Sequence, residues 1–186
     1  GGTSETALIS MGGVVALEAV RVGSFDLDVA IQNFIKKEFG VAIGERTAEE
    51  IKLTIGSASP YEGELRAEVR GRHISSGLPE VVVVSPSEIR GAIDEPVSTM
   101  VDSVTSCLSK APPEMAQDII VQGISLVGGG SLLKGFDTRL SEETDVPVHV
   151  VPNALEAVVL GAGRCIESFE SVRAMFMEDP NTRYRR

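Results

Sequence analysis

LVGGGSLLKG, residues 126–135, joins an apolar run to a helix-like pattern through three consecutive glycines. The run before it, Ile119–Val127, predicts a strand, and the residues after it predict a helix from Ser131 to Glu143. Glycines at such a junction let a ligand approach the backbone, and the N–H groups of the following helix favour an anion. The segment has neither the dinucleotide-binding spacing nor a Walker-type lysine, so alone it predicts a tight turn as readily as a ligand loop.

The rest of the chain alternates between strand and helix patterns. Two β-prone runs, Thr6–Ser10 and Val14–Val22, are separated by a short glycine-containing loop and predict a hairpin. Further strand patterns lie at Leu65–Arg72 and Val81–Val84. A helical pattern follows them, and we expect it to break or restart near Pro96.

This order of elements predicts a mixed α/β fold. The sheet and its flanking helices are expected from residues 1–35 and 92–170. A smaller subdomain of helices and a hairpin is expected as an insertion at residues 36–91. Residues 171–186 are expected to form a polar C-terminal tail.

Composition narrows the classes of function. The 186 residues carry a formal net charge of −10, which argues against broad nucleic-acid binding because phosphates would be repelled. Cys107 and Cys165 are far apart and are expected to be buried thiols in a reducing compartment. His73 and His149 have no nearby cysteine or carboxylate at ligand spacing, so no metal site is expected. No apolar run reaches the roughly 20 residues that a membrane-spanning helix needs.

Two further stretches are weak site candidates on their own. Gly1, Gly2 and Thr3 precede a strand, and backbone amides at such a position can cradle phosphates, although a glycine here is equally explained without a ligand. Between residues 47 and 56, Thr47 and Glu50 fit a capping box at the start of a helix.

On the same predicted helix, Glu49 and Lys52 lie three residues apart on one face. They predict either a solvated ion pair or a polar pair that contacts a ribose or an adenine. The residues alone favour the ion pair.

Taken in order, the motifs of this chain resemble one family. GGTSETALISMGGVV, IGERTAEEIKLTIGSA, VRGRHISSGLP, LVGGGSLLKGFDTRLSEETDVPVHV and LGAG are similar to the second half of MreB and Mbl, the bacterial actin homologues. GERTAEEIK and RGR…SGLP separate this family from the Hsp70 chaperones and actin, which share the fold and the glycine signatures. The resemblance covers nearly the whole chain except about the last twenty residues.

The resemblance implies the fold of the actin/Hsp70-type ATPases, in which two lobes close on ATP and magnesium. This chain would be the second lobe, with a sheet subdomain (IIA) and a smaller inserted subdomain (IIB). It also implies a nucleotide site: phosphate contacts from the first three residues, ribose and adenine contacts from the predicted helix, and adenosine and α-phosphate contacts from the glycine loop. The implied residues are Gly1, Gly2, Thr3, Glu49, Glu50, Ile51, Lys52, Gly128, Gly129, Gly130 and Ser131.

The chain departs from the family pattern at several points. The aspartate of the second phosphate motif would precede Gly1, and the first lobe, with the residue that positions the attacking water, is not part of the sequence. The family's Val-Gly-Gly-Asp is replaced by Val22-Gly23-Ser24-Phe25, and a usual Asp-Pro by Asn153-Ala154. Phosphoryl transfer needs in-line positioning of water against a metal-clamped phosphate. We therefore expect no catalytic residue, no significant ATPase activity and at most weak nucleotide affinity from this chain alone.

The resemblance implies a filament subunit that organises wall synthesis and cell shape in the cytoplasm, at the inner face of the membrane through partners. Expected partners are further copies or a full-length homologue, through contacts of IIB with IIA, and membrane-anchored proteins of the shape complex. The alternative is a non-polymerising nucleotide- or partner-binding module of the same fold. Leu132, Leu133, Leu160 and Ala162 are expected at an exposed interlobe face, which predicts self-association or the need for a partner.

Overall fold

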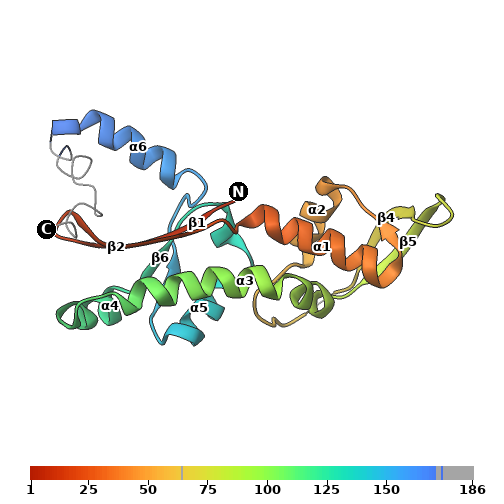
Figure 1. Ribbon diagram of the computed structural model, residues 1–186, viewed down its shortest axis with the longest axis horizontal. Helices are drawn as coiled ribbons and strands as arrows, with labels where there is room; N and C mark the ends of the chain where they lie inside the picture. The colour runs from red at the N-terminus through yellow and green to blue at the C-terminus, as the bar shows by residue number, and fades with distance from the viewer. Residues whose placement is uncertain (64, 171–172, 174–186) are drawn as a thin grey trace, which may run out of the picture.

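One long helix, α3 (Pro86–Ser109), runs along the molecule in the computed structural model, which describes residues 1–63, 65–170 and 173 (Figure 1). The Ser85 hydroxyl caps its start by accepting a hydrogen bond from the Glu88 N–H. The expected break near Pro96 is wrong, because α3 is continuous through that residue. Proline removes one helical hydrogen bond, but burial of Ile93 and Val97 on either side holds the helix to the core.

The predicted hairpin is confirmed. Strands β1 (Ser4–Ser10) and β2 (Gly13–Val20) pair antiparallel, and Met11 and Gly12 form the turn with φ of 50° and 77°. Positive φ at both central residues matches the right-handed twist of the strands. One face of the hairpin lies against α3, where the Cys107 thiol contacts the Thr6 carbonyl oxygen at 3.5 Å.

Helices α1 (Ser24–Phe39) and α2 (Glu45–Ile55) pack together at the other end of α3 and cover a small sheet. In that sheet β4 (Ala67–His73) lies between β3 (Val41–Ala42) and β5 (Pro79–Val84), and all neighbours are antiparallel.

The predicted capping box of Thr47 and Glu50 is wrong. Extended backbone at Gly44 already starts α2, and the Ala48 N–H donates to the Gly44 carbonyl at 3.1 Å. Thr47 therefore lies inside the first helical turn, too late to cap it.

The segment around the three glycines differs from its prediction. Residues 119–122 are helical rather than extended, and a 3-10 helix that begins at Gly129 stands where the α-helix was expected to start, while the α-helix itself begins at Phe136. A short apolar run does not distinguish a strand from a helix, and Pro113 begins a helical segment here. The elements in order are η1 (Pro113–Met115), α4 (Ala116–Gln122), β6 (Ile124–Leu126), η2 (Gly129–Leu132), α5 (Phe136–Thr144), β7 (Val148–Val150) and α6 (Ala157–Glu167).

Strands β6 and β7 are parallel and flanked by α5, whereas α6 stands apart from the body on the side of the hairpin away from α3 (Figure 1). The described part of α6 has no buried residue. Leu132, Leu160 and Ala162 are exposed as expected and Leu133 is half-buried.

The hydrophobic core joins α1, α2 and α3 to the sheet of β3–β5 and to Phe136 and Leu140 of α5. Helices α1 and α3 extend through the proposed boundaries at 35/36 and 91/92, so they connect the two proposed subdomains. Cys107 is buried, but the expectation for Cys165 is wrong because α6 leaves it partly exposed. The proposed tail lies, apart from Arg173, outside the described residues.

Candidate nucleotide site

The N-terminal residues lie directly against the start of α1. The Phe25 N–H donates to the Gly1 carbonyl at 3.0 Å, and the Ser4 hydroxyl donates to the Val22 carbonyl at 2.8 Å. A Cβ atom on Gly23 would lie 2.4 Å from the Gly1 oxygen, so only glycine permits this approach. Gly1, Gly2 and Thr3 themselves are exposed.

A buried ion pair fastens α2 to the same end of α1. The Lys52 ammonium donates to Asp28 at 2.9 Å, to the Ser24 hydroxyl at 2.8 Å and to the Ser24 carbonyl at 3.2 Å. Lys52 is 7% exposed and Asp28 8%. Since an ammonium has three donors, these three contacts satisfy it.

The surroundings of Asp28 alter the pKa of its carboxyl group. Burial raises the pKa of its carboxyl group above the ordinary value, and the hydrogen bond and charge of Lys52 oppose that shift. The negative charges of Glu49 and Glu45 add to the rise in the Asp28 pKa. Lys52 therefore favours the charged form of Asp28, against the effect of burial.

The structure divides the predicted residues of α2 into two groups. Glu49 and Glu50 are exposed, and the Arg46 Nε donates to Glu50 at 3.1 Å. Ile51 and Lys52 are buried, so the predicted solvated ion pair of Glu49 with Lys52 is wrong. Spacing along one helix could not reveal a partner that comes from α1.

The glycine loop is tied to the residues that follow α2. The Ala58 N–H donates to the Lys134 carbonyl at 2.7 Å, and the Ser59 hydroxyl donates to the Gly135 carbonyl at 3.1 Å. These contacts place the loop after β6 next to the end of α2. The three predicted segments are thus joined in one continuous series of contacts through Gly23, Lys52 and residues 57–59.

Within the loop, Gly128 has a φ of 83°, a conformation that favours glycine, and its N–H donates to the Ala154 carbonyl at 2.7 Å. The Ser131 side chain is buried and its hydroxyl donates to the Gly128 carbonyl at 2.7 Å. Ser131 therefore closes the turn, while Gly129 is exposed.

Sequence reasoning missed Ser24 and Asp28 as parts of this region. Their only sequence signal is a polar residue at each end of one helical turn, within an otherwise apolar face of α1. Asp26 contributes to the start of α1, because its carboxylate accepts a hydrogen bond from the Gly23 N–H at 2.7 Å.

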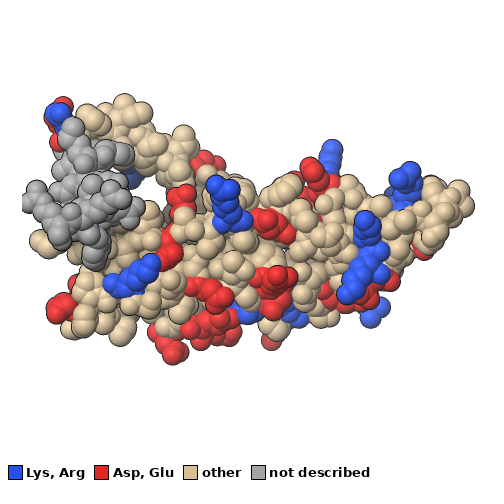
Figure 2. Space-filling model, in the orientation of Figure 1, with Lys and Arg blue, Asp and Glu red and all other residues tan. Residues whose placement is uncertain are grey.

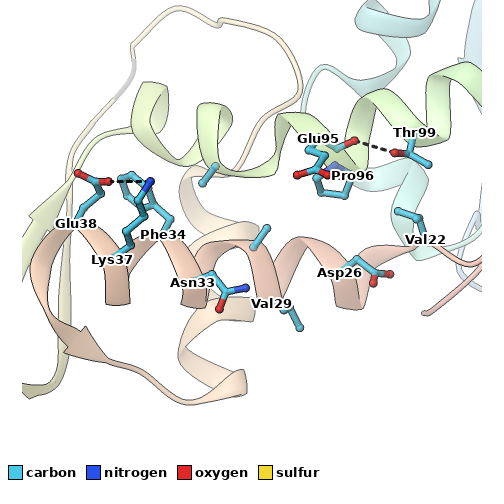
Figure 3. Close-up of a pocket in the computed structure, with 12 residues that line it drawn as sticks. Val22, Asp26, Val29, Asn33, Phe34, Lys37, Glu38, Glu95, Pro96 and Thr99 are labelled. Atoms are coloured by element: carbon cyan, nitrogen blue, oxygen red, sulfur yellow. Dashed lines mark hydrogen bonds and ion pairs between the residues drawn. The ribbon is translucent and has the colours of Figure 1, made fainter. Parts of the chain in front are cut away.

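Two hollows of the described surface lie elsewhere. One is a groove of about 490 Å³ between α1 and α3, with Val29 and Phe34 on one side and Pro96 and Thr99 on the other (Figure 3). The other, of about 580 Å³, lies between α3, α5 and the residues after α2. None of the predicted nucleotide residues lines either hollow.

The described residues hold no group of three or more His, Cys, Asp or Glu arranged around a possible metal ion. None of their helices is both long and apolar enough to span a bilayer.

Comparison with known proteins places these features in one family. The model of the MreB/Mbl protein family matches residues 1–174. The cell shape-determining protein MreB of Escherichia coli K12 is 42% identical over 170 residues, which are 91% of this chain and 49% of that protein. The cell shape-determining protein Mbl of Bacillus subtilis 168 is 37% identical over 92% of this chain and 52% of that protein.

Crystal structures of MreB5 of Spiroplasma citri, one bound to ADP and one to AMPPNP, superpose with a TM-score of 0.86 at 33% identity. In the ADP complex the match covers 90% of this chain and 51% of the other. The expected actin-like fold is confirmed, and the chain spans about half the length of the relatives it matches.

Proposed function

The chain belongs to the MreB/Mbl family, and from that premise we propose that it is one lobe of an actin-like filament subunit that determines bacterial cell shape. The observation that carries this proposal is the family match over residues 1–174, with 42% identity to a cell shape-determining protein. Organisation of cell-wall synthesis is part of the same proposal.

We propose that the three joined segments form one wall of a nucleotide cleft. Related MreB5 was crystallised with ADP and with AMPPNP, which supports a nucleotide as the ligand. Exposed Gly1, Gly2 and Thr3 would face the phosphates, and Glu49 and Glu50 the ribose and adenine. Gly128, Gly129 and Gly130 would face the adenosine, while buried Ile51, Lys52 and Ser131 support these surfaces from behind.

Magnesium would enter with the nucleotide in this proposal. Mg²⁺ commonly binds through phosphate oxygens, waters and only one or two carboxylates, so a preformed protein cage is not required. ATP hydrolysis needs a positioned water and a second wall, which this chain does not supply. We expect no magnesium-dependent ATP turnover by the purified chain, and robust turnover would overturn that expectation.

We propose self-assembly through contacts of subdomain IIB with IIA of a neighbouring copy or of a full-length homologue. Membrane-anchored shape proteins are proposed as further partners, with the chain on the cytoplasmic side of the membrane. The exposed apolar residues of α6 and of the hairpin support the need for a partner, because large exposed apolar patches are uncommon on monomers.

Co-sedimentation with full-length E. coli MreB tests the proposal. We expect the chain to pellet with the polymer in ATP, or to reduce polymer mass by capping, and to do neither in ADP. Unchanged polymer mass at a large excess of the chain would contradict a filament role. Fluorescent ADP that binds the chain in that case would instead favour the non-polymerising module.

A further inference from the structure

The hairpin of β4 and β5 has one buried face and one exposed face of unusual composition. Val69, Val82 and Val84 point into the core and are at most 8% exposed. On the opposite face Val81 and Val83 of β5 are 54% and 47% exposed. The register places Val81 opposite Arg70, and Pro79 opposite Arg72. The apolar residues of β5 therefore lie beside Arg70 and Arg72 of β4, with Glu68 on the same face opposite Val83.

These arginines are not neutralised within the described part of the chain. Arg70 and Arg72 have no ion-pair or hydrogen-bond partner among the described residues, and both are exposed. In Figure 2 basic side chains gather towards the end of the molecule that carries β4, β5 and the end of α1. Unpaired arginines on one face are notable in a chain with a net charge of −10.

Strand β5 is also an open edge. The sheet order is β3, β4, β5, and within the described residues the backbone of Pro79–Val84 pairs with β4 alone. An edge strand presents unpaired N–H and C=O groups along its free side, which is a template for an added strand. Four consecutive valines, Val81–Val84, give this edge a strong β preference.

We propose that β5 binds an extended acidic segment of a partner protein, which adds to the sheet as its fourth strand. An added strand would lie about 4.8 Å from β5 and roughly twice that from β4. Arginine side chains lying over the valines span most of that distance, so carboxylates on the added strand can meet Arg70 and Arg72. Apolar residues alternating with those carboxylates would contact Val81 and Val83.

Charge and the open strand edge together favour an acidic segment over a second copy, a nucleic acid or a lipid surface. A second copy pairing through the same edge would offer Arg70 and Arg72 no carboxylate, because the exposed face of its own β5 carries Pro79, Val81 and Val83. A nucleic acid or an anionic lipid surface has no strand backbone, so it would leave the N–H and C=O groups of the β5 edge unpaired. An acidic segment meets Arg70 and Arg72, which outnumber the single carboxylate of Glu68 on this face, and strand addition satisfies the open edge as well.

Fluorescence anisotropy with a labelled peptide of about ten residues, alternating Glu and Val, tests the proposal on the full chain. We expect saturable binding that falls about tenfold in Arg70→Gln/Arg72→Gln, as the loss of two exposed charge pairs predicts. The matched variant Arg21→Gln/Arg46→Gln changes net charge equally at exposed positions elsewhere and should bind as the unmodified chain does. The same peptide N-methylated at every second amide keeps its charge but cannot pair as a strand, and its binding should be lost.

Several results would overturn the proposal. Equal binding of the methylated peptide would show simple charge attraction. Absence of peptide binding, tighter binding of a Lys–Val peptide, or binding to phosphatidylglycerol vesicles instead would each exclude an acidic strand. Concentration-dependent dimerisation that persists in Arg70→Gln/Arg72→Gln would assign the edge to a second copy. The test uses neither nucleotide nor filament, so its failure leaves the proposed function untouched.

Discussion

Replacing Lys52 with Met removes the ammonium while keeping most of the side-chain volume, so it tests the buried link between α1 and α2. Asp28 would keep its buried position but lose its counter-charge. Removing one partner of a buried ion pair costs about 3–5 kcal/mol, because an uncompensated charge is left behind. We place the loss for Lys52→Met at about 3 kcal/mol, since Asp28 can escape part of the penalty by taking up a proton.

Urea unfolding followed by circular dichroism at pH 7 measures this loss. With a slope of roughly 2 kcal/mol per molar urea, a loss of about 3 kcal/mol lowers the midpoint by roughly 1.5 M. Asp28→Asn alone should cost less, because Lys52 keeps both contacts to Ser24. In the double variant Lys52→Met/Asp28→Leu an apolar pair replaces the ions, and most of the stability should return.

The pH dependence supplies a second signature. Burial raises the folded-state pKa of Asp28 above its unfolded value, so protonated Asp28 favours folding below the unfolded pKa. That contribution is lost as the pH rises through the folded pKa. Without Lys52 the Asp28 pKa rises further, so the cost of Lys52→Met should be largest at neutral pH and shrink towards pH 4. A midpoint for Lys52→Met within about 0.2 M urea of the unmodified chain at pH 7 would refute the reasoning.

Three further substitutions have defined outcomes. Gly23→Ala places a methyl group against the Gly1 carbonyl oxygen, so it should lower the free energy of unfolding in urea by about 1–3 kcal/mol. It should also accelerate hydrogen exchange at the Phe25 amide, which donates to that oxygen. Unchanged exchange would contradict the close approach. Ser85→Ala should cost about 1 kcal/mol at pH 7 through loss of the α3 cap. The hydrogen bond from the Ser85 hydroxyl is the main cause of the lowered pKa of Glu88. Ionised Glu88 therefore stabilises the folded chain above its unfolded pKa, and this contribution is lost in acid. The penalty of Ser85→Ala should accordingly fall when urea unfolding is measured at lower pH. Val158→Ser/Ile166→Ser on exposed α6 should reduce self-association in sedimentation velocity without lowering the unfolding midpoint, and a lowered midpoint would show that α6 is already packed.

Local chemistry made some elements predictable. The β1–β2 hairpin follows from a short loop whose Met11 and Gly12 take positive φ between two β-prone runs. The start of α1 is equally local, since the Asp26 carboxylate accepts a hydrogen bond from the Gly23 N–H three residues earlier. The residues that decide these features lie within a few positions of one another.

The strand predicted from Ile119 is wrong over its first residues for the opposite reason. Three apolar residues in a row, Ile119–Val121, fit a strand and a buried helix equally, and Pro113 begins a helical segment just before them. The helical outcome leaves Ile120 and Val121 of α4 exposed at 59% and 70%. Periodicity assumes that apolar residues are buried within the same chain, which is not so for these two residues.

Lys52 shows most clearly what a sequence pattern omits. Its spacing from Glu49 suggested a local pair, yet its partners Ser24 and Asp28 lie 28 and 24 residues away on α1. The family resemblance assigns the Lys52 ammonium to the nucleotide, but in the structure it pairs with the Asp28 carboxylate inside the protein. On the proposed cleft wall, phosphate contacts then fall to backbone N–H groups near Gly1–Thr3, and Glu49 and Glu50 of α2 add exposed negative charge to the same wall. Such a wall opposes a bare polyphosphate unless a divalent cation or a second lobe brings positive charge, which is the physical reason to expect weak binding by this half alone.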